Sequence, residues 1–126
     1  KAALSSLKTK ARIFGLSNII PVWANIEVAG ATKDIPRQSL DMVSLVQILF
    51  QSSDHEAIVA EVQRVIKPQA QVLVVDWNGR KMYFGPPLDK RLSQEYVTTL
   101  FTKHGFALQQ QIDADAYHYG LLFRKQ

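Results

Sequence analysis

Three consecutive residues, Asp76, Trp77 and Asn78, close an apolar run and carry side chains well suited to chemistry. The Asp76 carboxyl could orient a hydroxyl group or act as a general base, because a carboxylate can accept a proton. The Trp77 indole could form one wall of a pocket for an apolar substrate. A carboxylate at the end of a strand can instead be a buried structural group, and the sequence leaves both interpretations open.

A long irregular segment, residues 78–91, follows this triplet and contains Tyr83 together with Gly, Pro and several basic residues. Long loops in compact domains often carry binding residues, so this segment is a candidate lid or substrate-recognition loop. We therefore expect Trp77, Asn78 and Tyr83 to contact a substrate. A flexible, solvated loop is the alternative, and both interpretations fit better than nucleic-acid binding.

Other kinds of site have little support. The chain has no cysteine, which excludes disulfides, thiolate metal sites and a cysteine nucleophile. No His or carboxylate residues have the spacing of metal ligands, so we expect no metal. Neither a Ser-His-Asp pattern nor a glycine-rich phosphate loop is present. His118 and Tyr119 could reach a site only if their strand faces it, which the sequence alone does not decide.

The bulk properties indicate one domain over residues 1–126. The sequence is 47% hydrophobic and 21% charged, which is typical of a globular protein. The net charge of +4 is explained by a solvated surface better than by an anionic partner. No apolar run reaches the roughly 18 residues that a membrane span requires. We expect a cytoplasmic protein with no membrane and no nucleic-acid partner.

The hydrophobic pattern predicts alternating helices and strands. A first helix covers residues 1–14 and ends at Gly15. Predicted strands follow at residues 18–26, 39–50, 71–77, 106–112 and 116–123. Between the second and third of these, a helix begins at a capping box formed by Ser53 and Glu56 and is stopped by Pro68. A last helix is capped by Ser93, and its expected buried side is Tyr96, Val97, Leu100 and Phe101.

This order of elements predicts an α/β sheet with helices on both faces and a C-terminal antiparallel strand pair. In such sheets, ligands bind beyond the carboxyl ends of the parallel strands. Three segments far apart in the sequence should converge at that edge, namely residues 24–26, 46–50 and 76–78. The candidate residues of the first two segments are Asn25, Ile26, Val46 and Gln47.

The sequence resembles the later part of class I S-adenosylmethionine-dependent methyltransferases, most closely the ubiquinone- and menaquinone-biosynthesis type. Asn25 and Glu27 match a short "gnaE" element of that family. The segments IPRQSLDMV (residues 35–43) and EVQRVIKP (residues 61–68) match two further elements. The resemblance spans nearly the whole chain, and the combination of elements is more specific than any one of them. It implies a Rossmann-like methyltransferase sheet.

The resemblance also implies a function and a set of contacts. Asn25 and Ile26 would lie beside the adenine of S-adenosylmethionine, and Val46 and Gln47 would contact the same cofactor. The chain would transfer a methyl group to a small molecule, by an in-line reaction that needs exclusion of water more than a dedicated catalytic side chain. One alternative is a non-catalytic methyltransferase-like module for binding or assembly, and a weaker one, suggested only by the basic charge balance, is a methyltransferase of RNA or protein. The acceptor cannot be inferred from the sequence.

One departure from the family is large. The chain lacks the glycine-rich cofactor loop and the first two strands of the family, roughly the first third of the domain. Those strands would lie between residues 18–26 and residues 39–50, so two strand edges should be unpaired. We expect the missing segment to exist elsewhere or to have been cleaved. Otherwise the sheet must close up, or pair with another copy by oligomerisation or strand exchange.

Overall fold

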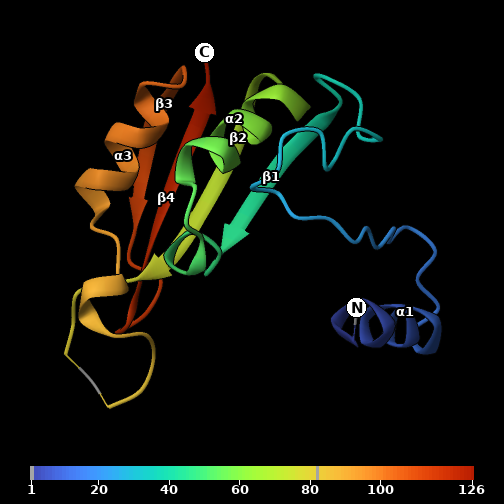
Figure 1. Ribbon diagram of the computed structural model, residues 1–126, viewed down its shortest axis with the longest axis horizontal. Coiled ribbons are helices and arrows are strands. Elements are labelled where there is room, and N and C mark those ends of the chain that lie inside the picture. Colours follow the sequence, from blue (N-terminus) through green and yellow to red (C-terminus); the bar gives the residue numbers. More distant parts are fainter. Residues whose placement is uncertain (1, 82) are drawn as a thin grey trace.

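A mixed sheet of four strands forms the body of the molecule (Figure 1). The computed structural model describes residues 2–81 and 83–126. The sheet has the order β1-β2-β4-β3, with β1 Leu40–Val46, β2 Ile66–Trp77, β3 Phe106–Ile112 and β4 His118–Lys125. Strands β1 and β2 are parallel, and β4 is antiparallel to β2 and β3. The expected α/β class with its terminal antiparallel pair is confirmed.

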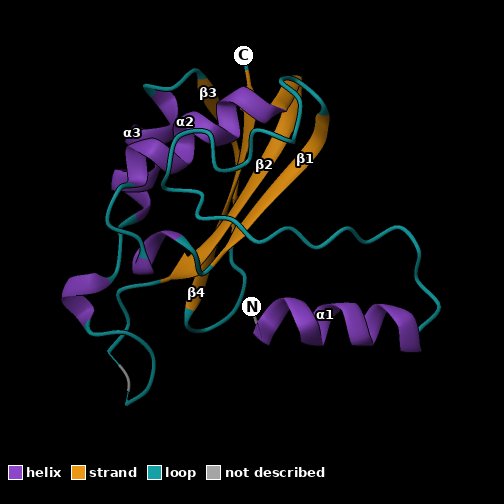
Figure 2. Ribbon diagram, turned by 45° about the vertical axis from the view of Figure 1, so that its right-hand side comes forward, coloured by secondary structure: helices purple, strands orange, loops and turns teal. Residues whose placement is uncertain are grey.

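Two helices, α2 His55–Val65 and α3 Gln94–Thr102, contact each other and lie on the same face of the sheet (Figure 2). The helix α1 Ala2–Ile13 lies apart from the four strands. The coverage of the sheet therefore differs from the expected two covered faces. Along β2, Val72 and Val74 are fully buried beneath the helices, whereas Leu73 and Val75 on the opposite face are half-buried.

The hydrophobic core fills the space between the sheet and these two helices. Phe101 of α3 stacks on Phe123 of β4, with ring centroids 4.5 Å apart, and meets Phe106 of β3 edge-on. Val62 of α2 and Leu121 of β4 are also almost fully buried. Because apolar side chains of all these elements interlock, the core fixes the sheet edge that holds the candidate site.

The start of α2 differs from the predicted capping box. The N-cap is Asp54, whose Oδ1 accepts a hydrogen bond of 3.0 Å from the backbone N–H of Ala57. Ser53 instead donates its own N–H and its hydroxyl to the carboxylate of Glu27. A charged acceptor makes the stronger hydrogen bond, so Glu27 takes Ser53 out of the capping position.

Helix α3 begins as predicted, because the hydroxyl of Ser93 accepts from the N–H of Tyr96 at 3.1 Å. Tyr96 itself does not belong to the buried side of the helix, since 43% of it is exposed. Its hydroxyl forms a 2.8 Å hydrogen bond with Nδ1 of His55 at the start of α2. A tyrosine can thus cover a helix junction while its polar end stays wet.

Strand boundaries shift from the predicted ones at three places, and one of them is β4, which spans His118–Lys125 where residues 116–123 were predicted. Strand β1 ends at Val46, because Gln47 adopts a left-handed backbone with φ of +56°. A short 3-10 helix, η1 Leu49–Gln51, follows. Strand β2 begins at Ile66 and includes Pro68, which is tolerated where the pairing with β1 is irregular.

The predicted strand over residues 18–26 does not form. This segment is irregular, and its apolar side chains are exposed, with Ile20 at 84% and Trp23 at 69%. A strand needs a neighbour to pair its backbone groups, and β1 pairs with β2 alone among the described strands.

Helix α1 ends as predicted near Gly15, whose φ is +67°. No helix in the described ranges is long and apolar enough to cross a membrane.

Candidate functional site

Side chains from three strand ends meet at the carboxyl edge of β1 and β2. Gln47 follows β1, Trp77 ends β2, and His118 begins β4 directly opposite Trp77 in the sheet register. The rings of Trp77 and His118 have centroids 4.3 Å apart. Nε2 of Gln47 lies 3.0 Å from Nε2 of His118. The structure thus brings Gln47 and Trp77 together, as the sheet argument required, and adds His118.

A carboxylate holds the other side of the His118 ring. Nδ1 of His118 lies 2.9 and 3.0 Å from the two carboxylate oxygens of Asp115. Asp115 Oδ1 also accepts the backbone N–H groups of Tyr117 and His118. The N–H of Tyr117 and the His118 side chain hold the pKa of Asp115 below its ordinary value. Asp115 is therefore an ionised partner that orients the imidazole.

The indole of Trp77 lies in an aromatic surround. Phe50 and Phe84 approach it edge-on, with centroids 6.5 and 6.4 Å away. The guanidinium of Arg91 lies 5.6 Å from the ring centroid, within the range of a cation–π contact. The indole N–H is buried and has no acceptor among the described residues. An unpaired buried donor is costly, so this atom is a natural contact for a bound oxygen.

Arg91 organises the loop that covers Trp77. Its guanidinium donates to the backbone carbonyls of Asn78 at 3.1 Å, Arg80 at 2.7 Å and Pro86 at 2.8 Å. The segment 78–91 is therefore tied to one side chain at several points and is not a plain solvated tether. Tyr83 projects from it fully exposed.

Asp76 is fully buried next to this cluster. Its Oδ1 accepts the N–H of Trp77 at 2.8 Å, and its Oδ2 accepts the N–H of Phe50 at 3.3 Å. Burial raises the pKa of Asp76, although both hydrogen bonds oppose that shift. The carboxyl thus fixes the turn after β1 against the end of β2, which favours the structural interpretation that the sequence left open.

Glu27 brings the predicted adenine-binding segment to the same end of the sheet. Its Oε1 accepts the N–H groups of Asp54 and Ser53, each at 2.7 Å. These backbone hydrogen bonds, that from Asp54 first, lower the pKa of Glu27. Asn25 lies exposed just before it, and Asn25 Oδ1 accepts the N–H of Glu27 at 3.0 Å. The segment 25–27 is therefore fixed beside the start of α2.

The two predicted apolar contacts point in different directions. Ile26 packs against the core and lines a small cavity of about 110 Å³ near α2. Val46, in contrast, is 50% exposed at the end of β1. Val46 therefore presents an accessible apolar surface at the carboxyl edge, whereas Ile26 mainly anchors its segment.

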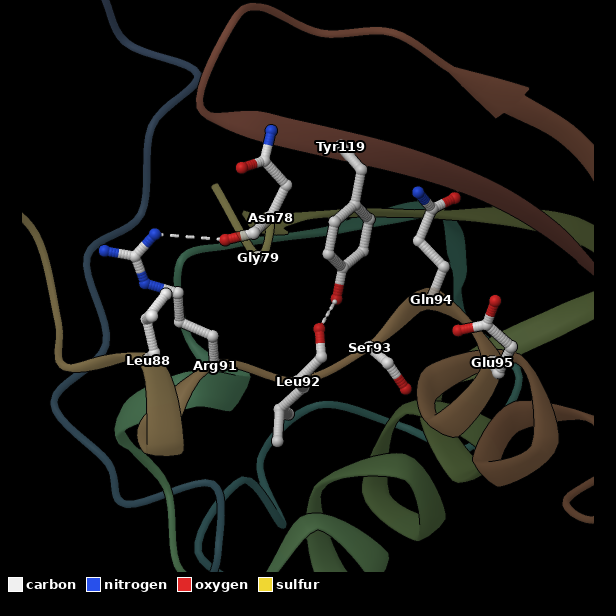
Figure 3. Close-up of a pocket in the computed structure, with 9 residues that line it drawn as sticks. All are labelled: Asn78, Gly79, Leu88, Arg91, Leu92, Ser93, Gln94, Glu95 and Tyr119. Carbon is white, nitrogen blue, oxygen red and sulfur yellow. Dashed lines mark hydrogen bonds between the residues drawn. The ribbon is translucent and has the colours of Figure 1, made fainter. Parts of the chain in front are cut away.

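A separate cavity of about 290 Å³ lies between the end of β2 and the start of α3 (Figure 3). Asn78, Arg91, Glu95 and Tyr119 line it. The Tyr119 hydroxyl donates to the carbonyl of Leu92 at 2.8 Å, and Arg91 donates to the carbonyl of Asn78. The polar ends of Tyr119 and Arg91 thus donate to backbone carbonyls of the protein itself. Internal hydrogen bonds therefore shape the wall of this cavity. It contains Asn78 of the predicted substrate residues.

The sequence reasoning did not assign roles to Asp115, Glu27 or Arg91. The spacing of Asp115 and His118 on a tight strand connection was a signal for the first, because residues at both ends of a turn can meet. Glu27 and Arg91 act through backbone groups distant in the sequence, which no local pattern reveals. In residues 2–81 and 83–126, no group of three His, Asp or Glu side chains could hold a metal ion.

Comparisons with known proteins agree with this architecture. No family model matches the sequence, and no curated protein matches it. Among solved structures, a SAM-dependent methyltransferase from Aquifex aeolicus superposes with a TM-score of 0.84 at 18% identity, covering 98% of this chain and 63% of that one. A protein described as a type 11 methyltransferase, from Sulfolobus solfataricus, has a TM-score of 0.70 at 25% identity, covering 95% and 65%.

A third similar structure is the [4+2]-cyclase SpnF, with a TM-score of 0.77 at 16% identity, covering 97% of this chain and 62% of that one. Likeness at these identities shows the fold, and one fold can carry different chemistries. The chain spans about two thirds of the length of these structures. It has the α/β fold of the class I S-adenosylmethionine-dependent methyltransferases, over part of their domain.

Proposed function

We propose that this chain is part of an S-adenosylmethionine-dependent methyltransferase that acts on a small molecule. The observation that carries the proposal is the position of segment 25–27, which Glu27 ties to the backbone of Ser53 and Asp54. The segment is thereby fixed at the start of α2, and the chain between Gln47 and α2 is short. The fold supports the proposal. The small-molecule acceptor and the activity of the whole protein are also part of what we propose.

The residues present fit the adenine part of the cofactor. The exocyclic amine of adenine needs an acceptor, and Oδ1 of exposed Asn25 keeps a second lone pair besides the one used by Glu27. An apolar ring needs accessible apolar surface, which Val46 offers at the same sheet edge. When bound, the cofactor supplies an electrophilic methyl group on a sulfonium. The protein's own part is to orient the acceptor and exclude water.

The acceptor would lie near Trp77 under segment 78–91. Trp77 offers an aromatic wall and an unpaired N–H, and Arg91 holds the covering loop in place. Asp76 contributes indirectly, by fixing the backbone of Trp77 and Phe50. Asn78 and the exposed Tyr83 would contact the acceptor only where the loop folds over it.

The first test is a calorimetric titration of S-adenosylhomocysteine into the 126-residue chain. We expect saturable binding at one site. Asn25→Ala should weaken it about tenfold, the usual loss for one hydrogen bond. Asn18→Ala, at another exposed asparagine of the same segment, is the matched control and should leave the affinity unchanged.

Two other outcomes have defined meanings. Binding by a longer product of the same gene, if one is made, but not by this chain would make the chain an incomplete part of the enzyme. Binding by neither would reject the methyltransferase and favour the non-catalytic module. Equal loss of affinity in both asparagine variants would contradict the role of Asn25.

A further inference from the structure

The imidazole of His118 is held from both sides at the carboxyl edge of β1 and β2. Its Nδ1 lies 2.9 and 3.0 Å from the oxygens of Asp115, and its Nε2 lies 3.0 Å from Nε2 of Gln47. A carboxylate only accepts hydrogen bonds, so Nδ1 carries the proton. The amide nitrogen of Gln47 only donates, so Nε2 is the acceptor. These contacts select the tautomer in which Nε2 is basic.

The groups around the ring keep it in this state. The Trp77 ring lies against one side at 4.3 Å, and 14% of the His118 side chain is exposed. Asp115 and Gln47 face its two nitrogens, and buried Asp76 on β2 interacts with it electrostatically. The hydrogen bonds to Asp115 from Tyr117 and His118 keep that carboxylate pointed at Nδ1.

Gln47 reaches Nε2 from a strained backbone. Its φ of +56° is a left-handed conformation that costs a residue with a side chain free energy. The conformation is held by the hydrogen bond from its N–H to the carbonyl of Val75, at 2.8 Å, and by its own carbonyl, which accepts from Gln51. Strained residues cluster at functional sites, and this one places an amide against the basic nitrogen.

We propose that Nε2 of His118 accepts the proton of the methyl acceptor, and that the acceptor is a hydroxyl group. This inference rests on the proposed function and adds the class of acceptor and the proton-accepting group. The hydroxyl takes the place that the Gln47 amide occupies at Nε2. Gln47 and Asp115 are positioning residues. The Gln47 amide lies beside the acceptor oxygen, and the Asp115 carboxylate holds Nδ1.

The step balances with the sulfonium cofactor as the only co-reactant. The acceptor oxygen bonds to the methyl carbon, the carbon–sulfur bond breaks, and its electron pair stays on sulfur. The hydroxyl proton moves to Nε2, and the resulting imidazolium is stabilised by Asp115. A hydroxyl benefits from such a base, because it is a weak nucleophile until its proton is withdrawn.

The test is nitrogen-15 NMR of the histidine rings in the full 126-residue chain, with S-adenosylhomocysteine present. We expect His118 to carry its proton on Nδ1 at pH 7.5. We expect phenol and benzyl alcohol, used as hydroxyl probes, to shift the Nε2 resonance. A proton on Nε2 before a probe is added would overturn the proposal. The absence of an Nε2 shift with either probe would overturn it as well.

Asp115→Asn should weaken the preference for the Nδ1 proton, because an amide can also donate to that nitrogen. Asp113→Asn, an exposed aspartate of the same connection, is the matched control and should leave the tautomer unchanged. His118→Gln should leave the affinity for S-adenosylhomocysteine within about twofold, a change below 0.5 kcal/mol, because His118 acts on the acceptor and not on the cofactor. An equal tautomer change in both aspartate variants would count against the positioning role of Asp115.

The same sample separates the two proposals. Cofactor-product binding together with a proton on Nε2 would reject the role of His118 and keep the methyltransferase. Absence of that binding, by this chain and by any longer product of the same gene, would reject the methyltransferase and the role of His118 with it.

Discussion

Two aspartates near the same sheet edge show how surroundings decide the role of a residue. Asp76 is fully buried, and desolvation raises its pKa. Asp115 is exposed, and the hydrogen bond from the N–H of Tyr117 is the main cause that lowers its pKa. The first serves as an acceptor for two backbone N–H groups, and the second as the partner of a histidine. Residue type alone does not distinguish these roles.

Removing the buried carboxyl should cost stability. Asp76→Ala leaves the N–H groups of Phe50 and Trp77 without their acceptor, and we expect a loss of about 2–4 kcal/mol in the free energy of unfolding. Urea denaturation measures it. Asp34→Ala, at an exposed aspartate, should change stability by less than about 0.5 kcal/mol. Equal effects would show that the Asp76 hydrogen bonds contribute little.

The link made by Glu27 should depend on pH. Its folded pKa lies below the ordinary value of 4.5, so the ionised carboxylate stabilises the fold above that value and this stabilisation is lost as pH falls through the folded pKa. The amide proton shifts of Ser53 and Asp54, followed from about pH 7 to about pH 2, should show a midpoint below 4.5. Glu27→Gln should remove this step. A midpoint at or above 4.5 in the wild-type chain would contradict the link.

At the scale of elements, α2 is the helix to which the other segments are fastened. Glu27 binds its beginning, and Lys125 of β4 donates to the carbonyls of Gln63 and Ile66 at its end, at 2.7 and 3.0 Å. Arg64 in its last turn donates to the carbonyls of Ile35 and Thr32, at 3.0 and 2.9 Å. The hydrogen bonds of the Arg64 side chain thus hold the loop before β1 against α2.

Arg64→Lys tests how much these hydrogen bonds of Arg64 stabilise the fold. A lysine cannot reproduce the planar fork that reaches two carbonyls and the Glu61 carboxylate, so we expect a loss of about 1–2 kcal/mol and faster hydrogen exchange in residues 30–37. Lys67→Ala breaks the exposed ion pair with Asp41 and should cost less than about 1 kcal/mol. A larger effect of the Lys67 change would refute the assignment.

At the scale of the whole molecule, the sheet is covered on one face and open on the other. Met42 of the edge strand β1 is 52% exposed on the open face. Further exposed apolar side chains belong to α1 and the segment after it, namely Ile13, Phe14, Ile20, Val22 and Trp23. An unpaired edge beside apolar surface is a template for pairing with another chain. We therefore expect this chain to self-associate through β1.

Met42→Lys should weaken that association, because a charge on an edge strand opposes edge-to-edge pairing. We expect sedimentation velocity to show concentration-dependent association of the wild-type chain and a dissociation constant at least about tenfold higher for the variant. Ala60→Lys adds the same charge at an exposed position of α2 and is the control. A wild-type chain that stays monomeric at all concentrations would reject the idea.

Much of the local structure follows from the sequence. The apolar stripe of α2, the Ser93 cap of α3 and the continuous apolar run that ends at Trp77 depend on neighbours along the chain, and the structure contains all three. The strand predicted over residues 18–26 was wrong, because an apolar pattern states what a strand would bury but does not supply its pairing partner. The Ser53 cap was wrong because a distant carboxylate competes for Ser53.

The candidate site also has some features that follow from the local sequence and others that depend on contacts between distant residues. The sequence determined the α/β class and the positions of Gln47 and Trp77 at the carboxyl edge of the sheet, and ligand binding at that edge stays a prediction. The tertiary structure alone decided that Asp76 is buried, that Glu27 links two distant segments, and that strand register sets His118 beside Trp77. These facts depend on contacts between residues far apart in the chain. Local propensity and spacing are blind to such contacts, because packing and register are fixed only when the whole sheet closes around its core.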